Sequence, residues 1–196
     1  MALLALGLLV LFGVVCIGVR GVIHLRQTGS SPFARGRGGA DGPAAIAAFT
    51  VPWIAAVALD TTGVLPRFAT GTWVAGIGVV LAVAGVALTM HAQLAMGASW
   101  RIGLDPEERT ALVTGGPYRW VRNPIYTAMF LFAAGLFLVI PNVASLAGLA
   151  AVIAVIDIVV RRVEEPFLLK VHGPAYAGWA ATTGRFLPGL GMWPAA

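Results

Sequence analysis

Charged residues and cysteine are both scarce in this sequence of 196 residues. Only 11% of the residues are charged, whereas 59% are hydrophobic and the mean hydropathy is +0.88. Soluble domains contain about half apolar and a quarter charged residues, so this composition excludes a soluble globular domain. The single cysteine cannot form a disulfide within the chain, and no cluster of cysteine and histidine has the spacing of a zinc site. Helices packed in lipid must therefore hold the fold together, and no metal is expected.

Lysine is almost absent, since it accounts for one of the 13 basic residues. The formal charge of +5 would suggest a nucleic-acid partner in a soluble protein. Here the basic residues stand between apolar stretches, where they report membrane orientation, so no nucleic-acid partner is expected. The abundance of arginine, alanine and glycine is typical of GC-rich coding sequence, which favours a bacterial inner membrane.

Several common catalytic motifs are also missing. The chain has no Walker loop, no Gly-x-Ser-x-Gly elbow and no His-Glu-x-x-His pair, which disfavours classical nucleotidases and hydrolases. Gly36 and Gly38 stand close together, but the strand and helix that a dinucleotide fingerprint requires do not flank them. His24, His91 and His172 lie in different segments, which is typical of satisfied polar residues rather than metal ligands.

Long hydrophobic runs are the dominant feature that is present. A helix needs about 20 apolar residues to cross a hydrocarbon core, with 17 to 25 as the usual range. Pro52 interrupts the second run and is expected to bend it. Only Pro141 and Asn142 separate the fourth and fifth runs, so these two helices are expected to form an antiparallel hairpin. The five predicted spans are residues 2–19, 44–59, 71–96, 124–140 and 143–160.

The basic residues are distributed unevenly between the two sides that five spans define. The segments after the first, third and fifth spans share one side and hold 12 of the 13 basic residues, while Arg67 lies on the other side. The positive-inside rule then places the N-terminus outside and the C-terminus in the cytoplasm. The predicted fold class is an all-α integral membrane protein with five transmembrane helices.

The loop before the fourth span is the first candidate for chemistry. Asn123 suits a helix N-cap and Pro124 suits the first helical position, so the first-turn amides would face this loop. A helix N-terminus beside Arg119 and Arg122 would favour an anionic group. The alternative is that the arginines meet lipid phosphates and that the local aromatic residues form an interfacial belt, namely Tyr118, Trp120 and Tyr126.

The end of the fifth span is the second candidate. Glu164 and Glu165 follow two arginines there, and adjacent helical residues point about 100° apart, so at most one acid faces a given cavity. One carboxylate would suit an ammonium group or a ribose hydroxyl. The alternative is a solvated helix end with weak surface ion pairs. Asp157 lies one turn deeper, where an ionisable group usually faces protein or a water-filled cavity.

Four groups of residues carry a family resemblance when they are taken in chain order. They are Leu-Ala-Met-Gly-Ala-Ser-Trp-Arg at 94–101, Leu-Val-Thr-x-Gly-Pro-Tyr at 112–118, Arg-Asn-Pro-x-Tyr at 122–126, and Glu164-Glu165 followed by Gly173, Tyr176 and Pro188. Together they resemble the integral-membrane methyltransferases of the isoprenylcysteine carboxyl methyltransferase and phospholipid methyltransferase group. The resemblance covers about residues 94–188, which suggests a boundary between helical residues 1–93, with their cytosolic linker, and a methyltransferase region at 94–196.

The resemblance implies a transferase that uses S-adenosyl-L-methionine in a C-terminal cytosolic cofactor-binding region. The methyl acceptor is expected to be a lipophilic small molecule or a lipid that enters from the membrane. Glu164 matches the family's cofactor-contacting acid and is expected to hold the cofactor's ammonium. Because adjacent helical residues diverge, Glu165 is expected to matter less for the cofactor and to pair with Arg161 or Arg162. The cofactor-binding candidates are Thr110, Ala111, Leu112, Val113, Tyr118, Asn123, Pro124, Ile125, Tyr126, Glu164 and Glu165, and the catalytic candidates are Arg161, Arg162 and Arg122.

Two departures from the family pattern affect this interpretation. The family usually has histidine where this chain has Asn123, and a tyrosine where it has Trp179. An asparagine still donates and accepts hydrogen bonds but does not titrate near neutrality. Two other functions stay open from the sequence, namely a membrane NADPH-dependent reductase of the sterol reductase kind and a membrane scaffold without catalytic activity.

Overall fold

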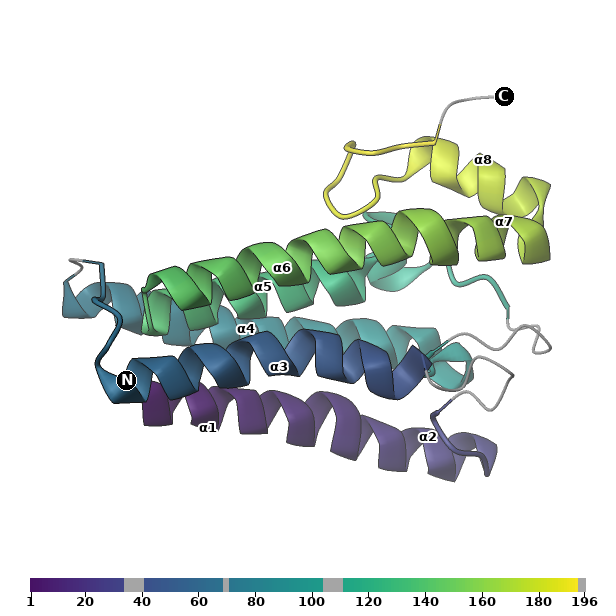
Figure 1. Cartoon of the computed structure of the whole chain (residues 1–196). Coiled ribbons are helices and arrows are strands. Elements are labelled where there is room, and N and C mark those ends of the chain that lie inside the picture. The colour runs from purple at the N-terminus through teal and green to yellow at the C-terminus, as the bar shows by residue number, and fades with distance from the viewer. Residues whose placement is uncertain (34–40, 69–70, 104–110, 194–196) are drawn as a thin grey trace.

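A computed structural model describes residues 1–33, 41–68, 71–103 and 111–193. Within these residues the secondary structure is helical, and the strand-like pairings there are two isolated bridges. Figure 1 shows the long helices lying alongside one another as a bundle, with α7 and α8 at one end of it. The N-terminus lies at the opposite end. The expectation of an all-α protein is therefore confirmed for the part of the chain that is described.

The first helical segment is longer than the hydrophobic run that predicts it. It consists of α1 (Ala2–Phe12), a π-helical stretch (Gly13–Val19) and α2 (Arg20–Thr28), without a break between them. Gly29 ends the helix with a φ of +69°, a left-handed conformation that glycine adopts without steric cost. The helix continues past Val19 because Arg20 and His24 are buried against the protein rather than left in lipid.

The remaining helices follow in chain order and end in two short helices. Their bounds are α3 (Asp41–Thr62), α4 (Thr72–Met96), a 3₁₀ turn η2 (Gly97–Ser99), a second 3₁₀ turn η3 (Gly116–Arg119), α5 (Pro124–Val139), α6 (Val143–Val159), a π-helical turn η4 (Val160–Glu164), α7 (Glu165–His172) and α8 (Pro174–Thr182). Helix α3 runs through Pro52, which lies against Gly148 of α6. A small residue at this point lets the two backbones approach closely.

Three helical segments among the described residues are long and apolar enough to cross a membrane. They are Ala2–Thr28, Thr72–Ser99 and Val143–His172, whereas Ile46–Thr62 and Pro124–Val139 are apolar but shorter. All five segments lie in the same bundle (Figure 1). Three candidate spans are thus supported, and the count of five stays a prediction.

The predicted hairpin between the fourth and fifth spans is present. Asn142 caps α6 by accepting a hydrogen bond from the Ser145 amide at 2.9 Å, and the Ser145 hydroxyl accepts one from the Asn142 amide. This reciprocal capping box satisfies two amides that would otherwise lack partners. The Asn142 side chain also donates to Asp60, which forms a salt bridge of 2.6 Å with Arg67. Arg67 therefore helps to join the α3–α4 connection to the hairpin.

Helices α4 and α5 approach each other through small residues. A Cβ atom added at Gly85 would lie 2.6 Å from the backbone nitrogen of Phe132, and one at Gly135 would lie 2.5 Å from the nitrogen of Ala82. Real Cβ atoms do not come so close, so only glycine fits at these two positions. Such contacts between small residues are a main source of helix association in lipid, where burial of apolar side chains gives little advantage.

We expect the Gly85→Val substitution to destabilise the protein by forcing α4 and α5 apart. Overpacking of a tight contact typically costs about 1–3 kcal/mol. Gly76→Val in the same helix is a matched control, because a Cβ at Gly76 meets no described atom within 4 Å. Thermal denaturation of both variants in the same detergent measures the difference. Equal melting temperatures for the two variants would contradict this packing.

Candidate functional site

The segment after α8 folds back onto the loop before α5. The Arg122 amide donates to the Gly184 carbonyl at 2.8 Å, and the Asn123 amide donates to the Arg185 carbonyl at 3.1 Å. Four residues after Asn123, the Thr127 hydroxyl donates to the Phe186 carbonyl at 2.7 Å. These contacts join the loop before α5 to a segment about 60 residues further along the chain.

Arg122 and Glu165 form the centre of this junction. The Arg122 Nη2 atom donates to Glu165 Oε1 at 2.6 Å, and both side chains are almost completely buried. Arg122 also donates to the carbonyls of Ala180, Thr183 and Gly191. Arg185 completes the cluster with two hydrogen bonds of 2.9 Å to the Glu165 carboxylate. These bonds raise the pKa of Arg185, so the guanidinium stays charged.

The partners of Glu165 differ from those expected from the sequence. The predicted pairing with Arg161 or Arg162 is wrong, because Glu165 binds Arg122 and Arg185 instead. Arg122 also does not extend freely beside the α5 N-terminus, since it reaches into the junction with α7 and the C-terminal segment. These contacts favour an architectural role for both residues, while their assigned catalytic and cofactor roles stay predictions.

Glu164 points away from Glu165, towards α5. Its Oε1 atom accepts a hydrogen bond of 2.5 Å from the Tyr126 hydroxyl, a length typical of a charge-assisted bond. No residue in the described part of the chain donates a hydrogen bond to Oε2 of Glu164. The π-helical turn (Val160–Glu164) immediately precedes Glu165, and such turns are often found at functional sites. Glu164 and Glu165 thus point in different directions and bind different partners, as the sequence predicts.

Tyr118 lies in the same interior. It is 6% exposed, and its hydroxyl donates to the Ala92 carbonyl at 3.4 Å. Burial is the main reason that the pKa of Tyr118 is raised, and the Glu164 carboxylate raises it further. The phenol is therefore neutral at physiological pH. Because Tyr118 and Tyr126 lie within the protein and Trp120 is 58% exposed, the three do not form one interfacial belt.

The start of α5 has the predicted position but not the predicted cap. Pro124 is the first helical residue and Asn123 precedes it. The Asn123 side chain makes no capping hydrogen bond to the helix, and its Nδ2 atom donates instead to the Arg185 carbonyl at 3.2 Å. Asn123 therefore ties the C-terminal segment to the loop. Ile125 is partly buried beside it in the first turn.

The other predicted site residues are more exposed. Ala111 is exposed, Leu112 and Val113 are partly buried without regular secondary structure, and Thr110 lies outside the described residues. Arg161 and Arg162 are exposed, and Arg161 donates two hydrogen bonds of 2.8 Å to Asp157. Asp157 therefore pairs along its own helix. None of these contacts brings Arg161 or Arg162 to Glu164 within the part of the chain that the structure describes.

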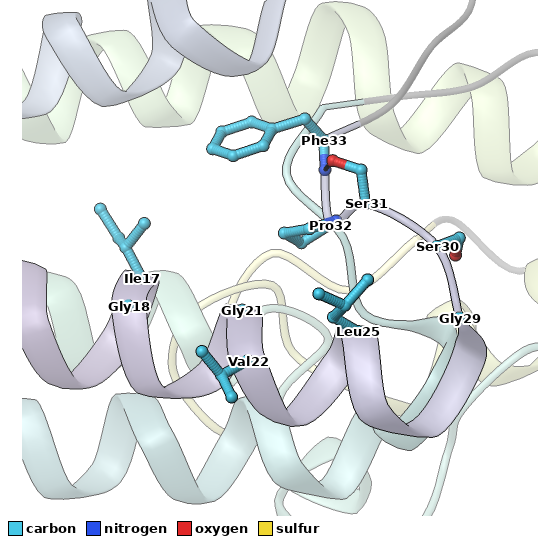
Figure 2. A pocket seen from close by; sticks show the side chains of 10 residues that line it. All are labelled: Ile17, Gly18, Gly21, Val22, Leu25, Gly29, Ser30, Ser31, Pro32 and Phe33. Carbon is cyan, nitrogen blue, oxygen red and sulfur yellow. Dashed lines mark hydrogen bonds between the residues drawn. The ribbon is translucent and has the colours of Figure 1, made fainter.

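An apolar groove of about 560 Å³ lies elsewhere, on the first helical segment. Pro32 and Phe33 lie over the helix face that carries Ile17, Gly21 and Leu25 (Figure 2). The groove contains none of the predicted site residues. It is therefore separate from the junction of α5, α7 and the C-terminal segment.

Comparison with known families identifies the fold and the region that carries this site. The model of the phospholipid methyltransferase family matches residues 73–175, just over half of the chain. The chain belongs to the phospholipid methyltransferase family. The match includes α4, α5, both acids and the start of α8, so the resemblance found in the sequence is confirmed at the level of the family.

Individual relatives show how far this similarity extends. The cobalt-zinc-cadmium resistance protein CzcN of Cupriavidus metallidurans is 32% identical over 124 residues, which are 63% of this chain and 55% of that protein. Protein-S-isoprenylcysteine O-methyltransferase A of Arabidopsis thaliana is 28% identical over 120 residues, which are 59% of this chain and 60% of the plant protein. This chain thus matches little more than half the length of these curated relatives.

A solved structure supports the same fold. The eukaryotic intramembrane Ras methyltransferase, isoprenylcysteine carboxyl methyltransferase, superposes with a TM-score of 0.58 at 22% sequence identity. The superposition covers 77% of this chain and 54% of the methyltransferase. Together with the long apolar helices, this likeness identifies an integral membrane protein with the fold of that enzyme.

Proposed function

We propose that this protein transfers a methyl group from S-adenosyl-L-methionine to a lipophilic acceptor in the membrane, a lipid or a prenyl-type compound. The family match supports methyl transfer, and the observation that carries the cofactor proposal is the pair formed by Tyr126 and Glu164. The pair lies at the junction of α5, η4 and the loop before α5, within the residues that match the family.

The side chains at this junction fit the amino-acid part of the cofactor. Oε1 of Glu164 is held by Tyr126, which fixes the carboxylate. Oε2, which has no donor among the described residues, is left for an ammonium group. A fixed carboxylate binds an ammonium by charge-assisted hydrogen bonds, which are stronger than neutral ones. Tyr118 provides a second buried aromatic ring in this region, and the Glu164 carboxylate raises the pKa of its phenol. Aromatic faces of this kind pack favourably on planar rings such as adenine.

The reaction makes modest chemical demands on the protein. When bound, S-adenosyl-L-methionine supplies a methyl group on a sulfonium, which an acceptor atom attacks in line as the carbon–sulfur bond breaks. An acceptor that is already an anion needs no general base. The protein's own residues therefore contribute mainly by orienting the two reactants and excluding water. Arg122, Glu165 and Arg185 serve this purpose by fixing the C-terminal segment against α5.

Cofactor binding is the experiment that tests this function. We expect S-adenosylhomocysteine, but not NADPH, to raise the melting temperature of the purified protein in detergent, because only a ligand of the native state stabilises it. Stabilisation by NADPH alone would support a reductase of the sterol reductase kind. If neither compound stabilised the protein, a scaffold without catalytic activity would be favoured. If S-adenosylhomocysteine stabilises the protein, a methyl-transfer screen on native lipid extracts would identify the acceptor.

We also propose that the end of the bundle carrying α7 and α8 faces the cytoplasm. The 12 to 1 distribution of basic residues supports this orientation. A cysteine introduced at Ser30 is expected to resist an impermeant thiol reagent added to intact cells, whereas one introduced at Thr62 is expected to react. Labelling in the opposite pattern would reverse the orientation.

A further inference from the structure

Arg20, at the start of α2, is completely buried. Its Nη2 atom donates to the carbonyls of Gly97, at 2.5 Å, and Gln93, at 3.3 Å, both at the C-terminal end of α4. Its guanidinium carbon lies 4.5 Å from the centre of the Trp100 ring. Its Nε and Nη1 atoms are buried and have no hydrogen-bond partner among the described residues. Several of its donors are therefore unused.

Arg20 also lacks the kind of counter-charge that Arg122, another deeply buried arginine, has. Arg122 meets the Glu165 carboxylate at 2.6 Å. Arg20 meets only carbonyl oxygens and an aromatic face, and no carboxylate in the described part of the chain pairs with it. A buried ion without a counter-charge is costly, and carbonyl dipoles offset only part of that cost. An arginine kept in this state inside a membrane protein indicates a binding function.

Other unpaired polar atoms lie next to Arg20. His24, one turn further along α2, is 5% exposed, and its Nδ1 atom has no partner among the described residues. The His24 and Trp100 rings meet edge to face, with their centres 5.9 Å apart. Both Arg20 and His24 therefore border the same indole. The hydroxyl of Thr89 and the amide oxygen of Gln93, on the facing helix α4, are likewise buried and unpaired within the described residues.

Tyr118 connects this group to the candidate cofactor site. The Tyr118 hydroxyl donates to the Ala92 carbonyl at 3.4 Å, and Arg20 donates to the carbonyl of the next residue, Gln93. The Glu164 carboxylate raises the pKa of this phenol, and the Arg20 guanidinium lowers it. The interior of this end of the bundle thus has an acid on the α5 and α7 side and an arginine on the α2 side. A ligand or pair of ligands with a cationic and an anionic group would match this arrangement of charge.

We propose that Arg20 and His24 form an oxyanion-binding subsite, which takes the carboxylate or phosphate group of a ligand that enters the same interior as the group held by Glu164. The proposal rests on the proposed function, because it assigns the anionic group either to the cofactor or to the methyl acceptor. The guanidinium supplies the charge and the unused donors. The His24 Nδ1 atom supplies a second donor when it carries the proton of a neutral imidazole.

The experiment compares probes with and without an anionic group. For the cofactor, the probes are S-adenosylhomocysteine and 5′-methylthioadenosine, which lacks the amino-acid group. For an acceptor carboxylate they are N-acetyl-S-farnesylcysteine and its amide, and for an acceptor phosphate they are phosphatidic acid and diacylglycerol. The affinity of each is measured for the full chain in an uncharged detergent. The variants are Arg20→Gln and the matched control Arg26→Gln, which alters an exposed arginine of the same helix.

We expect Arg20→Gln to lower the affinity for one anionic probe by roughly ten- to a hundred-fold and to leave its neutral partner unaffected. The probe that responds identifies the source of the oxyanion. Unchanged affinity for all three anionic probes would overturn the proposal, as would an equal loss for an anionic probe and its neutral partner. Binding of S-adenosylhomocysteine to the unaltered chain tests the proposed function separately.

A second variant keeps the proposal testable if Arg20→Gln does not fold. His24→Phe keeps the edge contact with Trp100 but removes Nδ1, and we expect a loss of about three- to ten-fold for the same anionic probe. Affinity equal to that of the unaltered chain would argue against the subsite.

Discussion

Glu164→Gln is expected to weaken binding of S-adenosylhomocysteine by about ten- to a hundred-fold. The substitution replaces a charge-assisted hydrogen bond to the ligand's ammonium with a neutral one, which costs roughly 1.5–3 kcal/mol. It preserves the shape of the side chain, and the Gln oxygen still accepts the hydrogen bond from Tyr126. The fold should therefore survive, so that calorimetry in detergent reports the loss of charge rather than a loss of structure.

Asp157→Asn is the matched control for this measurement. It removes an acid from α6, the helix that leads into η4, but Asp157 pairs with Arg161 at the surface and not with α5. We expect its affinity for S-adenosylhomocysteine to equal that of the unaltered protein. If Glu164→Gln also bound normally, the ammonium would not be held by this acid and the cofactor site would lie elsewhere in the bundle.

The sequence predicts the helices well because lipid imposes a simple rule on them. A run of apolar residues long enough to cross a membrane must satisfy its backbone hydrogen bonds internally, which requires a helix. The hairpin at Pro141 and Asn142 follows from the same rule, since two residues leave room only for an antiparallel return. Helix ends are less predictable, because Arg20 and His24 extend the first helix through contacts with α4 and η2.

The directions of Glu164 and Glu165 were also predictable, but their partners were not. Adjacent helical residues diverge whatever surrounds them. Which arginine meets Glu165 depends instead on how the segment after α8 returns to the start of α5, and Arg185 reaches the acid only through that return. The proximity of Arg161 and Arg162 in the sequence was therefore a misleading signal.

Arg20 illustrates what a motif search misses. The first helical segment lies outside residues 73–175, which match the family, so no motif draws attention to it. A signal was nevertheless present, because a single arginine at the end of an apolar run is either an interfacial residue or a buried functional one. Only its contacts with α4 and Trp100 distinguish the two.

Glu165→Gln is expected to destabilise the whole protein and not one binding site. The substitution leaves Arg122 and Arg185 without their shared counter-charge, and Arg122 is almost completely buried. Removing one partner of a buried ion pair typically costs about 3–5 kcal/mol, because the remaining charge stays desolvated. For a chain of this size each kcal/mol corresponds to a shift of roughly 2–4 °C in melting temperature. Denaturation in detergent, followed by tryptophan fluorescence, measures the effect.

The same Asp157→Asn variant separates this effect from the general loss of an ion pair. Asp157 and Arg161 are 34% and 53% exposed, and exposed pairs contribute about 0–1 kcal/mol, so its melting temperature should hardly change. Near-normal stability of Glu165→Gln would mean that the carbonyls of Ala180, Thr183 and Gly191 are sufficient to hold Arg122. Glu165 would then be free to serve the ligand. The two acids are thus distinguished by which property fails, since Glu164 is expected to affect ligand affinity and Glu165 the stability of the fold that positions it.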